Sequence, residues 1–208
     1  MQKILLEIYE KFKETYNIEN WWPIYDGKEP FTEISVGAIL TQNTNWNNVE
    51  KALKNLMSYE LLTLEKLKDI DIEFLHELIK PAGFYTRKSK TIKEFATKSY
   101  KRKQIDREFL LSIKGIGKET ADSILLYGLN RPVFVVDAYT KRLFSRLGFV
   151  KEKEKYDRIQ KFFMENLPND VSLFKEYHAG IVEHCKAFCK KKPNCEKCIL
   201  KDLCFYPT

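Results

Sequence analysis

Apolar residues recur at intervals of three and four along most of the chain, with charged and polar residues between them. This spacing puts apolar side chains on one face of an α-helix. It is clearest at 4–12, 34–40, 49–56 and 143–147. Proline and glycine interrupt the pattern at 22–23, 26–28, 81–83, 115–117, 128–132 and 168–170. The pattern predicts an all-α fold of about ten helices joined by short turns.

One β-branched run departs from the helical pattern. It reads PVFVVD at 132–137, and no second strand or Asn-Gly hairpin accompanies it. A run this short cannot build a sheet by itself. We expect it to lead into a helix that begins after Asp137, because aspartate is a favoured N-cap residue.

The length of the chain limits the number of domains, and its charge indicates the kind of partner that it binds. A chain of 208 residues can form one compact domain or two small lobes. Its net charge of +7 and pI near 9.0 favour a polyanionic partner such as nucleic acid. No apolar run reaches membrane-spanning length, and the first sixteen residues carry charges throughout. We therefore expect a cytoplasmic protein that does not contact membranes.

The segment KGIGK at 114–118 lies between two apolar helical patterns. Its glycines can adopt positive φ and leave backbone N–H groups uncovered at the start of the next helix. Such a helix start can bind a phosphate, and Lys114 and Lys118 add positive charge beside Gly115 and Gly117. A plain corner between two helices would explain the same pattern.

Four cysteines lie near the C-terminus in a C-x5-C-x2-C-x5-C pattern: Cys189, Cys195, Cys198 and Cys204. Thiols stay reduced in the cytosol, so a group like this is retained for metal binding rather than for disulfides. Four thiolates bind either zinc or a [4Fe–4S] cluster, and the spacing does not decide between them. Cys185, one helical turn earlier, reads as a small buried apolar residue.

Together, the glycine turn and the cysteine loop resemble the endonuclease III superfamily of helix-hairpin-helix DNA glycosylases. The hairpin spans about 107–128, the family's aspartate is Asp137, and the loop at 189–204 is similar to the family's iron–sulfur loop. The resemblance covers nearly the whole chain and implies a [4Fe–4S] cluster. Iron–sulfur members usually space their first two cysteines C-x6-C, so Cys185 is an alternative to Cys189 as the first ligand.

The resemblance also implies how the chain is organised. It predicts a helical barrel domain at 25–131 that contains the hairpin. A second helical lobe forms from 1–24 and 132–208 and carries the cluster loop. Double-stranded DNA with a damaged base would lie across the cleft between the two lobes. We expect a monomer associated with the nucleoid.

Within the superfamily, four segments are most similar to the 3-methyladenine DNA glycosylase III branch: WWP at 21–23, LTQNT at 40–44, PAGFY at 81–85 and KGIGKETADSILLY at 114–127. The best-known members of that branch lack the cluster. Gln42 corresponds to the residue that fills the gap left by an extruded nucleotide. Glu119 stands where bifunctional members have a catalytic lysine. Without an amine there, no Schiff base can form with the sugar, which predicts a monofunctional enzyme.

Asp137 is the candidate catalytic residue. An ionised carboxylate near C1′ stabilises an oxocarbenium-like sugar and can orient water, and the same residue can also cap a helix. Trp21, Trp22, Pro23 and Trp46 are candidates for the base pocket, because aromatic faces suit a cationic alkylated purine. Tryptophans of this kind also pack in protein cores.

The sequence therefore predicts a monofunctional DNA glycosylase of base excision repair that acts on an alkylated purine such as 3-methyladenine. One alternative is an endonuclease III-like enzyme for oxidised or mismatched pyrimidines, read by polar groups such as Asn43, Asn45 and Glu119. Another is a lesion-DNA-binding protein without catalysis. We expect His178 and His184 to be core or supporting groups rather than acids or bases.

Overall fold

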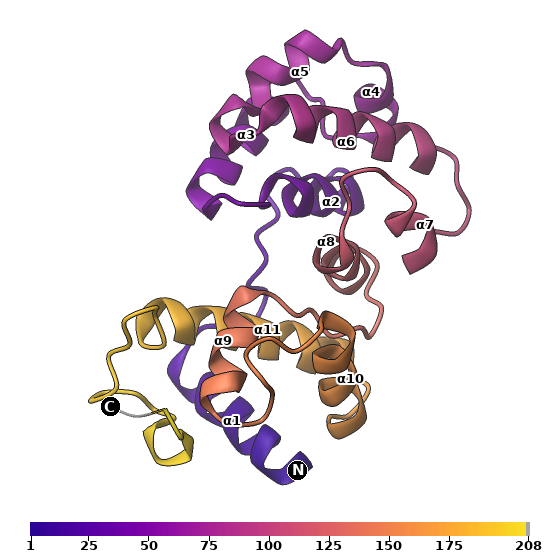
Figure 1. The fold of residues 1–208 in the computed structure, drawn as a ribbon. Coiled ribbons are helices and arrows are strands. Elements are labelled where there is room, and N and C mark those ends of the chain that lie inside the picture. The colour runs from indigo at the N-terminus through magenta and orange to yellow at the C-terminus, as the bar shows by residue number, and fades with distance from the viewer. Residues whose placement is uncertain (207–208) are drawn as a thin grey trace. The chain divides into compact units, whose positions relative to one another are not determined.

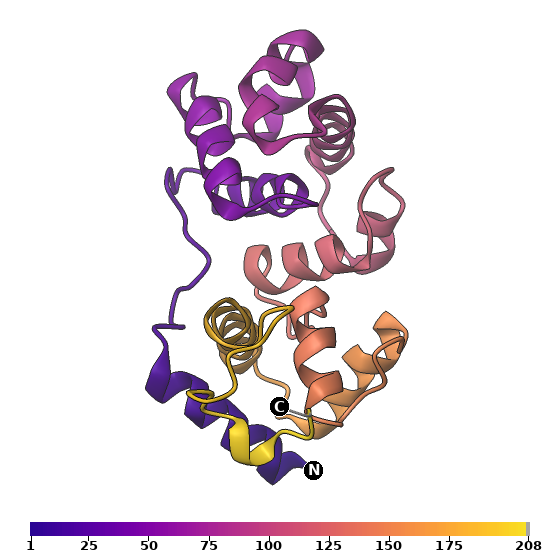
Figure 2. The same ribbon diagram turned by 60° about the vertical axis from the view of Figure 1, so that its left-hand side comes forward.

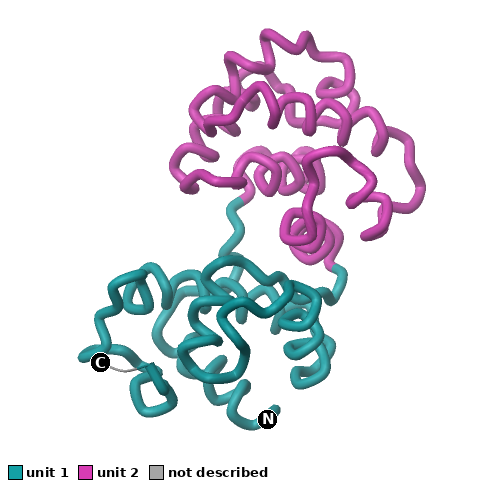
Figure 3. Tube along the Cα trace, viewed as in Figure 1, with its two compact units in different colours: residues 1–23, 131–208 teal, residues 24–130 magenta. Residues whose placement is uncertain are grey.

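The computed structural model describes residues 1–206, and within this range it contains eleven α-helices and no strand (Figure 1). The predicted all-α fold is confirmed. The chain divides into two compact units (Figure 3). One is Ile24–Asn130, and the other joins Met1–Pro23 to the chain from Arg131 onward. No helix in the described range is long and apolar enough to cross a membrane.

The unit at 24–130 is built around α2 (Pro30–Leu40), which is buried at every residue from Thr32 to Leu40. A helix that is apolar on all sides must be covered all round, and α2 contacts α3, α6, α8 and η2. The other helices are α3 (Trp46–Ser58), α4 (Leu64–Asp69), α5 (Ile72–Ile79), α6 (Tyr85–Ser99), α7 (Arg107–Leu111) and α8 (Lys118–Ser123). A 3-10 turn, η1 (Lys80–Ala82), precedes α6, and a π-helical segment, η2 (Ile124–Gly128), continues α8.

Glu33 of α2 is a buried acid that fixes the entry to this unit. Its carboxylate accepts hydrogen bonds from the backbone N–H groups of Tyr25, Asp26 and Gly27 at 2.5, 3.1 and 3.2 Å. A buried carboxylate is tolerated where such donors satisfy it. The loop that follows Pro23 is therefore attached to the central helix.

The second unit contains α1 (Gln2–Thr15), α9 (Ala138–Arg146), α10 (Tyr156–Asn166), α11 (Val171–Ala187) and the short η3 (Lys201–Leu203). Helix α11 packs against α1 and α9 (Figures 1 and 2). Gly180 lets α1 and α11 approach closely, because a Cβ there would lie 2.7 Å from the Phe12 side chain. Stacked and edge-on aromatic rings fill the core, and the Phe134 and Phe163 rings lie 4.0 Å apart.

The segment 132–137 forms no strand and leads into α9, as predicted. Phe134, Val135 and Val136 are buried in the core of this unit. Asp137 then ends the segment as the N-cap of α9. The apolar run thus serves to anchor the residue that follows it.

Candidate functional site

The hairpin joins α7 to α8 through residues 112–117. Gly115 has a φ of +96°, and Ile116 is buried beneath the turn. Lys114 and Lys118 are exposed on either side. Gly117 differs from our expectation of positive φ: it is extended, with φ −93° and ψ 179°, and is the N-cap of α8. A side chain there would meet nothing within 4 Å, so neither conformation nor packing within the chain requires glycine at 117.

Two contacts hold the hairpin rigid. The Arg107 guanidinium of α7 donates to both carboxylate oxygens of Asp122 in α8, at 2.7 and 2.9 Å. Asp122 is fully buried, so this bidentate pair neutralises a charge inside the unit. On the other side, Thr91 Oγ1 donates to the carbonyl of Lys114 at 3.0 Å. These contacts attach the turn to α6 and join its two helices to each other.

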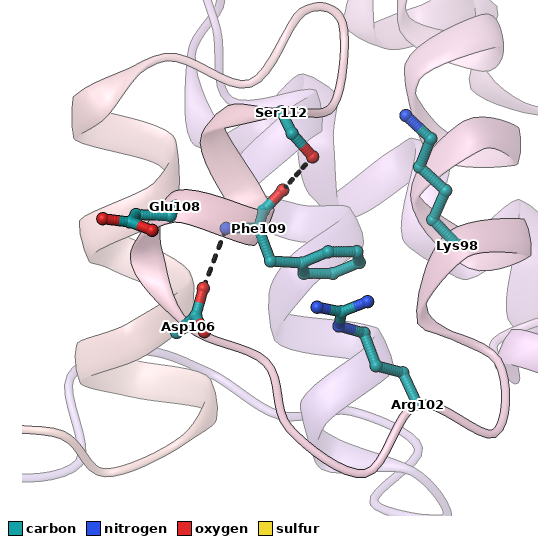
Figure 4. Close-up of a pocket in the computed structure, with 6 residues that line it drawn as sticks. All are labelled: Lys98, Arg102, Asp106, Glu108, Phe109 and Ser112. Carbon is teal, nitrogen blue, oxygen red and sulfur yellow. Dashed lines mark hydrogen bonds between the residues drawn. The ribbon is translucent and has the colours of Figure 1, made fainter.

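A surface groove borders the first hairpin helix, lined by Lys98, Arg102, Asp106, Glu108, Phe109 and Ser112 (Figure 4). The Arg102 guanidinium lies over the Phe109 ring at 3.9 Å. Asp106 caps α7 by accepting from the Phe109 N–H at 2.8 Å. Two cations and two acids share this groove, so it does not extend the cationic surface of the turn.

Gln42 lies just beyond the end of α2, in the turn before α3. Its Nε2 donates to the carbonyl of Gly115 at 2.9 Å and to Thr120 Oγ1 at 3.0 Å. The residue expected to fill the DNA stack is therefore in direct contact with the hairpin, 73 residues away in the sequence. Glu119, on the first turn of α8, is exposed.

Sequence reasoning missed two residues close to these turns. Lys88 is buried, and its Nζ donates to the carbonyls of Leu40 and Ala82, both at 2.8 Å. Burial lowers its pKa to about 8. This lysine ties the end of α2, before Gln42, to the turn that carries Phe84. Phe84 itself is 58% exposed and has a φ of +48°, in the left-handed region that bulky residues rarely adopt. Neither property could be recognised in the sequence.

In the other unit, the Asp137 side chain is 13% exposed and caps α9. Its Oδ1 accepts from the Thr140 backbone N–H at 2.7 Å and from Thr140 Oγ1 at 2.8 Å. Its Oδ2 faces His178 Nε2 at 3.7 Å. Burial acts to raise the pKa of Asp137, but the interactions with His178 and Thr140 outweigh it and hold this pKa below its ordinary value. The carboxylate is thus held ionised.

Trp21 belongs to the same unit and lies next to His178. The two rings are 5.9 Å apart and nearly perpendicular, at 86°. The Trp21 indole N–H donates to Glu183 at 2.8 Å, and Trp22 lies edge-on to Trp21. Trp22 and Pro23 are half-buried. The structure therefore assembles Asp137, His178 and Trp21 in one cluster.

Trp46 belongs to the unit at 24–130 together with Gln42 and Glu119. It is half-buried, and its indole N–H donates to the Tyr25 hydroxyl at 3.1 Å. Asn45, weighed above as a polar base contact, caps α3 by accepting from the Asn48 N–H. That bond gives Asn45 a local structural role.

All four cysteines of the predicted ligand set line one small cavity: Cys189, Cys195, Cys198 and Cys204. Apolar side chains complete its wall, including Leu143, Leu147, Phe188 and Leu200. Arg146, at the end of α9, donates to Cys189 Sγ at 3.2 Å and to the carbonyls of Lys190 and Lys191. The loop is thereby attached to α9, the helix that Asp137 caps.

Cys185 does not line this cavity, and its Sγ lies 3.6 Å from the Tyr139 carbonyl. His184 does line it, with Nε2 3.5 Å from Cys198 Sγ, and burial lowers the His184 pKa to about 4. Within residues 1–206, no group of three or more His, Cys, Asp or Glu side chains converges closely enough to hold a single metal ion.

Comparison with known proteins identifies the family of this chain. The model of the HhH-GPD superfamily of base excision DNA repair proteins matches residues 36–169. A protein of Methanocaldococcus jannaschii named as a candidate DNA repair glycosylase is 50% identical, over 97% of this chain and 96% of that protein. Endonuclease III of Thermotoga maritima is 33% identical, over 86% of this chain and 84% of that protein.

Two solved structures extend the comparison. The 3-methyladenine DNA glycosylase of H. pylori bound to 1,N6-ethenoadenine has a TM-score of 0.74 and 31% identity, covering 89% of this chain and 97% of that one. A non-covalent endonuclease III–DNA complex has a TM-score of 0.80 at 23% identity, covering 97% of this chain and 92% of that one, and shares the fold. The chain belongs to the HhH-GPD superfamily of base excision DNA repair proteins, and is a DNA glycosylase of the endonuclease III superfamily.

Proposed function

We propose that this glycosylase is monofunctional and releases an alkylated purine, such as 3-methyladenine, from double-stranded DNA. The observation that carries the proposal is the Asp137 carboxylate, which is oriented by the cap of α9 and held ionised. As the C1′–N bond breaks, positive charge develops on the sugar, and a nearby fixed anion stabilises it. The oxygen of water then bonds to C1′, and its proton leaves with the base or with solvent.

Glu119 supports the monofunctional assignment. Strand cleavage by β-elimination begins with an amine that attacks C1′ and forms a Schiff base with the opened sugar. A carboxylate on the exposed first turn of α8 cannot perform that step. Lys118 is adjacent but projects about 100° away around the helix. The abasic product should therefore remain uncut.

For the damaged base we propose contacts with Trp21, Trp22 and Pro23, which belong to the same unit as Asp137, after the base has been extruded from the stack. Trp46 belongs to the other unit and is a separate candidate for contact with the base. Aromatic faces attract a cationic alkylated purine. The 31% identical glycosylase of H. pylori is an enzyme for 3-methyladenine, which supports the same substrate class here. Gln42 would fill the vacated stack, and exposed Phe84 is a second candidate for contact with bases.

The hairpin would bind the DNA backbone. Lys114 and Lys118 flank the turn, and the backbone at Gly115 and Gly117 is exposed between them. The open space beside Gly117 allows a phosphate to approach the N–H groups at the start of α8. We propose that the protein binds DNA as a monomer.

The cysteine loop fits a [4Fe–4S] cluster held by Cys189, Cys195, Cys198 and Cys204. The fit rests on the common cavity that all four thiols line, and four thiolates are the usual ligand set of such a cluster. When bound, the cluster supplies a four-point crosslink of the loop. Anaerobically purified protein should be brown, and colourless protein with one zinc per chain would refute this assignment. Cys198→Ser should lower thermal stability and DNA affinity together.

A second function, endonuclease III-like release of oxidised or mismatched pyrimidines, is favoured by the 33% identity to endonuclease III and by the cysteine loop. The two functions differ in the released base and in strand cleavage. They are separated by a panel of duplexes that carry methylated purines, thymine glycol, uracil or a G·T mismatch.

The test compares wild type, Asp137→Asn and Asp170→Asn on that panel. Asp170 caps α11 in the same way, by accepting from the Leu173 N–H at 2.7 Å, and is the matched control for loss of a capping charge. We expect wild type and Asp170→Asn to release methylpurine without cutting the strand, and Asp137→Asn to be inactive. Release of pyrimidines, or direct cleavage, would support the second function. Duplex binding without release of any base would indicate a non-catalytic protein.

The lyase assignment has its own test. Glu119→Lys supplies an amine at the position where bifunctional relatives carry one, so borohydride should trap it covalently on substrate DNA, whereas wild type should give no adduct. Trapping of the wild type would refute the monofunctional assignment.

A further inference from the structure

The two oxygens of the Asp137 carboxylate have different surroundings. Oδ1 is occupied by the backbone and hydroxyl donors of Thr140. Oδ2 takes no part in the cap and faces the ring of His178 at 3.7 Å. The cap therefore fixes the position of Oδ1. The contact of Oδ2 is with a histidine that lies 41 residues further along the chain.

His178 is well placed to fix the position of Oδ2. It lies on α11, its side chain is 6% exposed, and its Nε2 is the atom directed at Oδ2. The His178 ring also lies edge-on to Trp21, whose indole N–H donates a hydrogen bond to Glu183 on the same helix. Since Trp21 is held by α11, the imidazole contacts an indole of fixed position as well as the carboxylate.

We propose that His178 is a positioning residue for the glycosylase reaction, which orients Oδ2 of Asp137 and keeps that oxygen as the anionic one. The inference rests on the proposed catalytic role of Asp137. His178 acts through Asp137 and needs no contact with the DNA. His178 also contacts Trp21, a proposed base-pocket residue. A shift of Trp21 would therefore move His178 and change the orientation of the Asp137 carboxylate.

Replacing His178 should shift the pH dependence of base release in one direction. Removing His178 leaves burial, which raises the pKa of Asp137, opposed only by Thr140. The acidic limb of the kcat profile should then move to higher pH. At a pH below the limb, the ionised fraction of Asp137 falls about tenfold for every pH unit by which the limb moves. His178 is the titratable group that lowers the pKa of Asp137. The Cys185 thiol, whose own pKa is raised by Asp137, is unchanged in the variant.

The experiment measures single-turnover base release from about pH 3 to 8 for wild type, His178→Leu and His178→Gln, because the wild-type pKa of Asp137 lies below its ordinary value. His178→Leu should lose about tenfold or more in rate near the limb and shift it upward, with little change in substrate affinity. His178→Gln keeps an N–H donor and should restore most of the rate. His76→Gln is the matched control, since this buried histidine pairs with Glu73 in the other unit. Thermal unfolding of each variant reports any loss of fold.

A second readout does not depend on activity. Carbon-13 NMR titration of the Asp137 carboxyl should give a higher pKa in His178→Leu than in wild type. The inference would be overturned if the pKa of Asp137 were the same in His178→Leu and wild type. It would also be overturned if the rates and the acidic limbs of the pH–rate profiles were the same in all variants. Absence of base release by wild type, with the NMR difference present, would overturn the proposed function and leave the His178–Asp137 coupling established.

Discussion

Replacing Gly115 with alanine should destabilise the protein through two effects that the structure separates. The first is backbone strain, because a φ of +96° costs an L-residue about 1–3 kcal/mol. The second is steric, since a Cβ at 115 would lie 2.2 Å from Thr91 Oγ1. Thr91 must then turn away and lose its bond to the Lys114 carbonyl, worth about 1 kcal/mol. The expected total is about 2–4 kcal/mol.

Gly117→Ala is the matched control in the same turn. Its extended backbone accepts any residue, and a Cβ there meets nothing. Alanine is a poorer N-cap than glycine by a few tenths to about 1 kcal/mol. It also reduces the entropy of the unfolded chain, which offsets this cost by about 0.4–1 kcal/mol. Stability should change by less than about 0.5 kcal/mol, whereas affinity for duplex DNA should fall, because the added methyl group faces the proposed phosphate site.

Urea denaturation followed by tryptophan fluorescence measures both effects, with the slope m expected to be unchanged. Thr91→Ala completes a double-mutant cycle with Gly115→Ala. If the clash contributes, the double variant should be more stable than the sum of the single changes predicts, by about 0.5 kcal/mol or more. Equal midpoints for Gly115→Ala and Gly117→Ala would refute the assignment of different roles to the two glycines.

Two further predictions concern buried charges. Lys88 has a pKa of about 8 in the folded protein and its ordinary, higher value when unfolded, so stability should rise between about pH 8 and 10.5 and level off below pH 8. Lys88→Met should lack this rise, and parallel stability curves for the two proteins would contradict it. Arg107→Leu removes the guanidinium from fully buried Asp122 and should cost about 3–5 kcal/mol. Lys98→Ala, which loses an exposed pair with Glu94, should cost less than about 1 kcal/mol in the same urea titration.

The features that could be predicted from sequence are those set by local interactions. The 3.6-residue period identified the helices, and proline and glycine marked their ends, because both signals act within one or two turns of the chain. The Asp137 cap was predictable for the same reason, since its partner is three residues away. The cysteines that line one cavity also lie within sixteen consecutive residues.

Features that depend on distant residues could not be predicted. Lys88 looks like a solvent-exposed lysine in a polar helix, yet its partners are carbonyls at Leu40 and Ala82. No pattern in the sequence pairs Gln42 with Gly115, because the contact exists only once α2 and the hairpin have packed together. The conformation of Gly117 was mispredicted because the motif alone does not say which glycine makes the turn.

Helix α9 connects the cysteine loop to the carboxylate that we propose to be catalytic. Asp137 begins the helix, and Arg146 ends it with bonds to Cys189 and to two carbonyls of the loop. Arg142 adds a bond to the Cys189 carbonyl at 2.8 Å. A nine-residue helix derives little stability from its own hydrogen bonds. Fixing its C-terminal end therefore restricts the motion of the whole helix, including the N-cap carboxylate. A loop crosslinked by the proposed cluster would therefore support the proposed role of Asp137 by holding α9, without contact with the substrate.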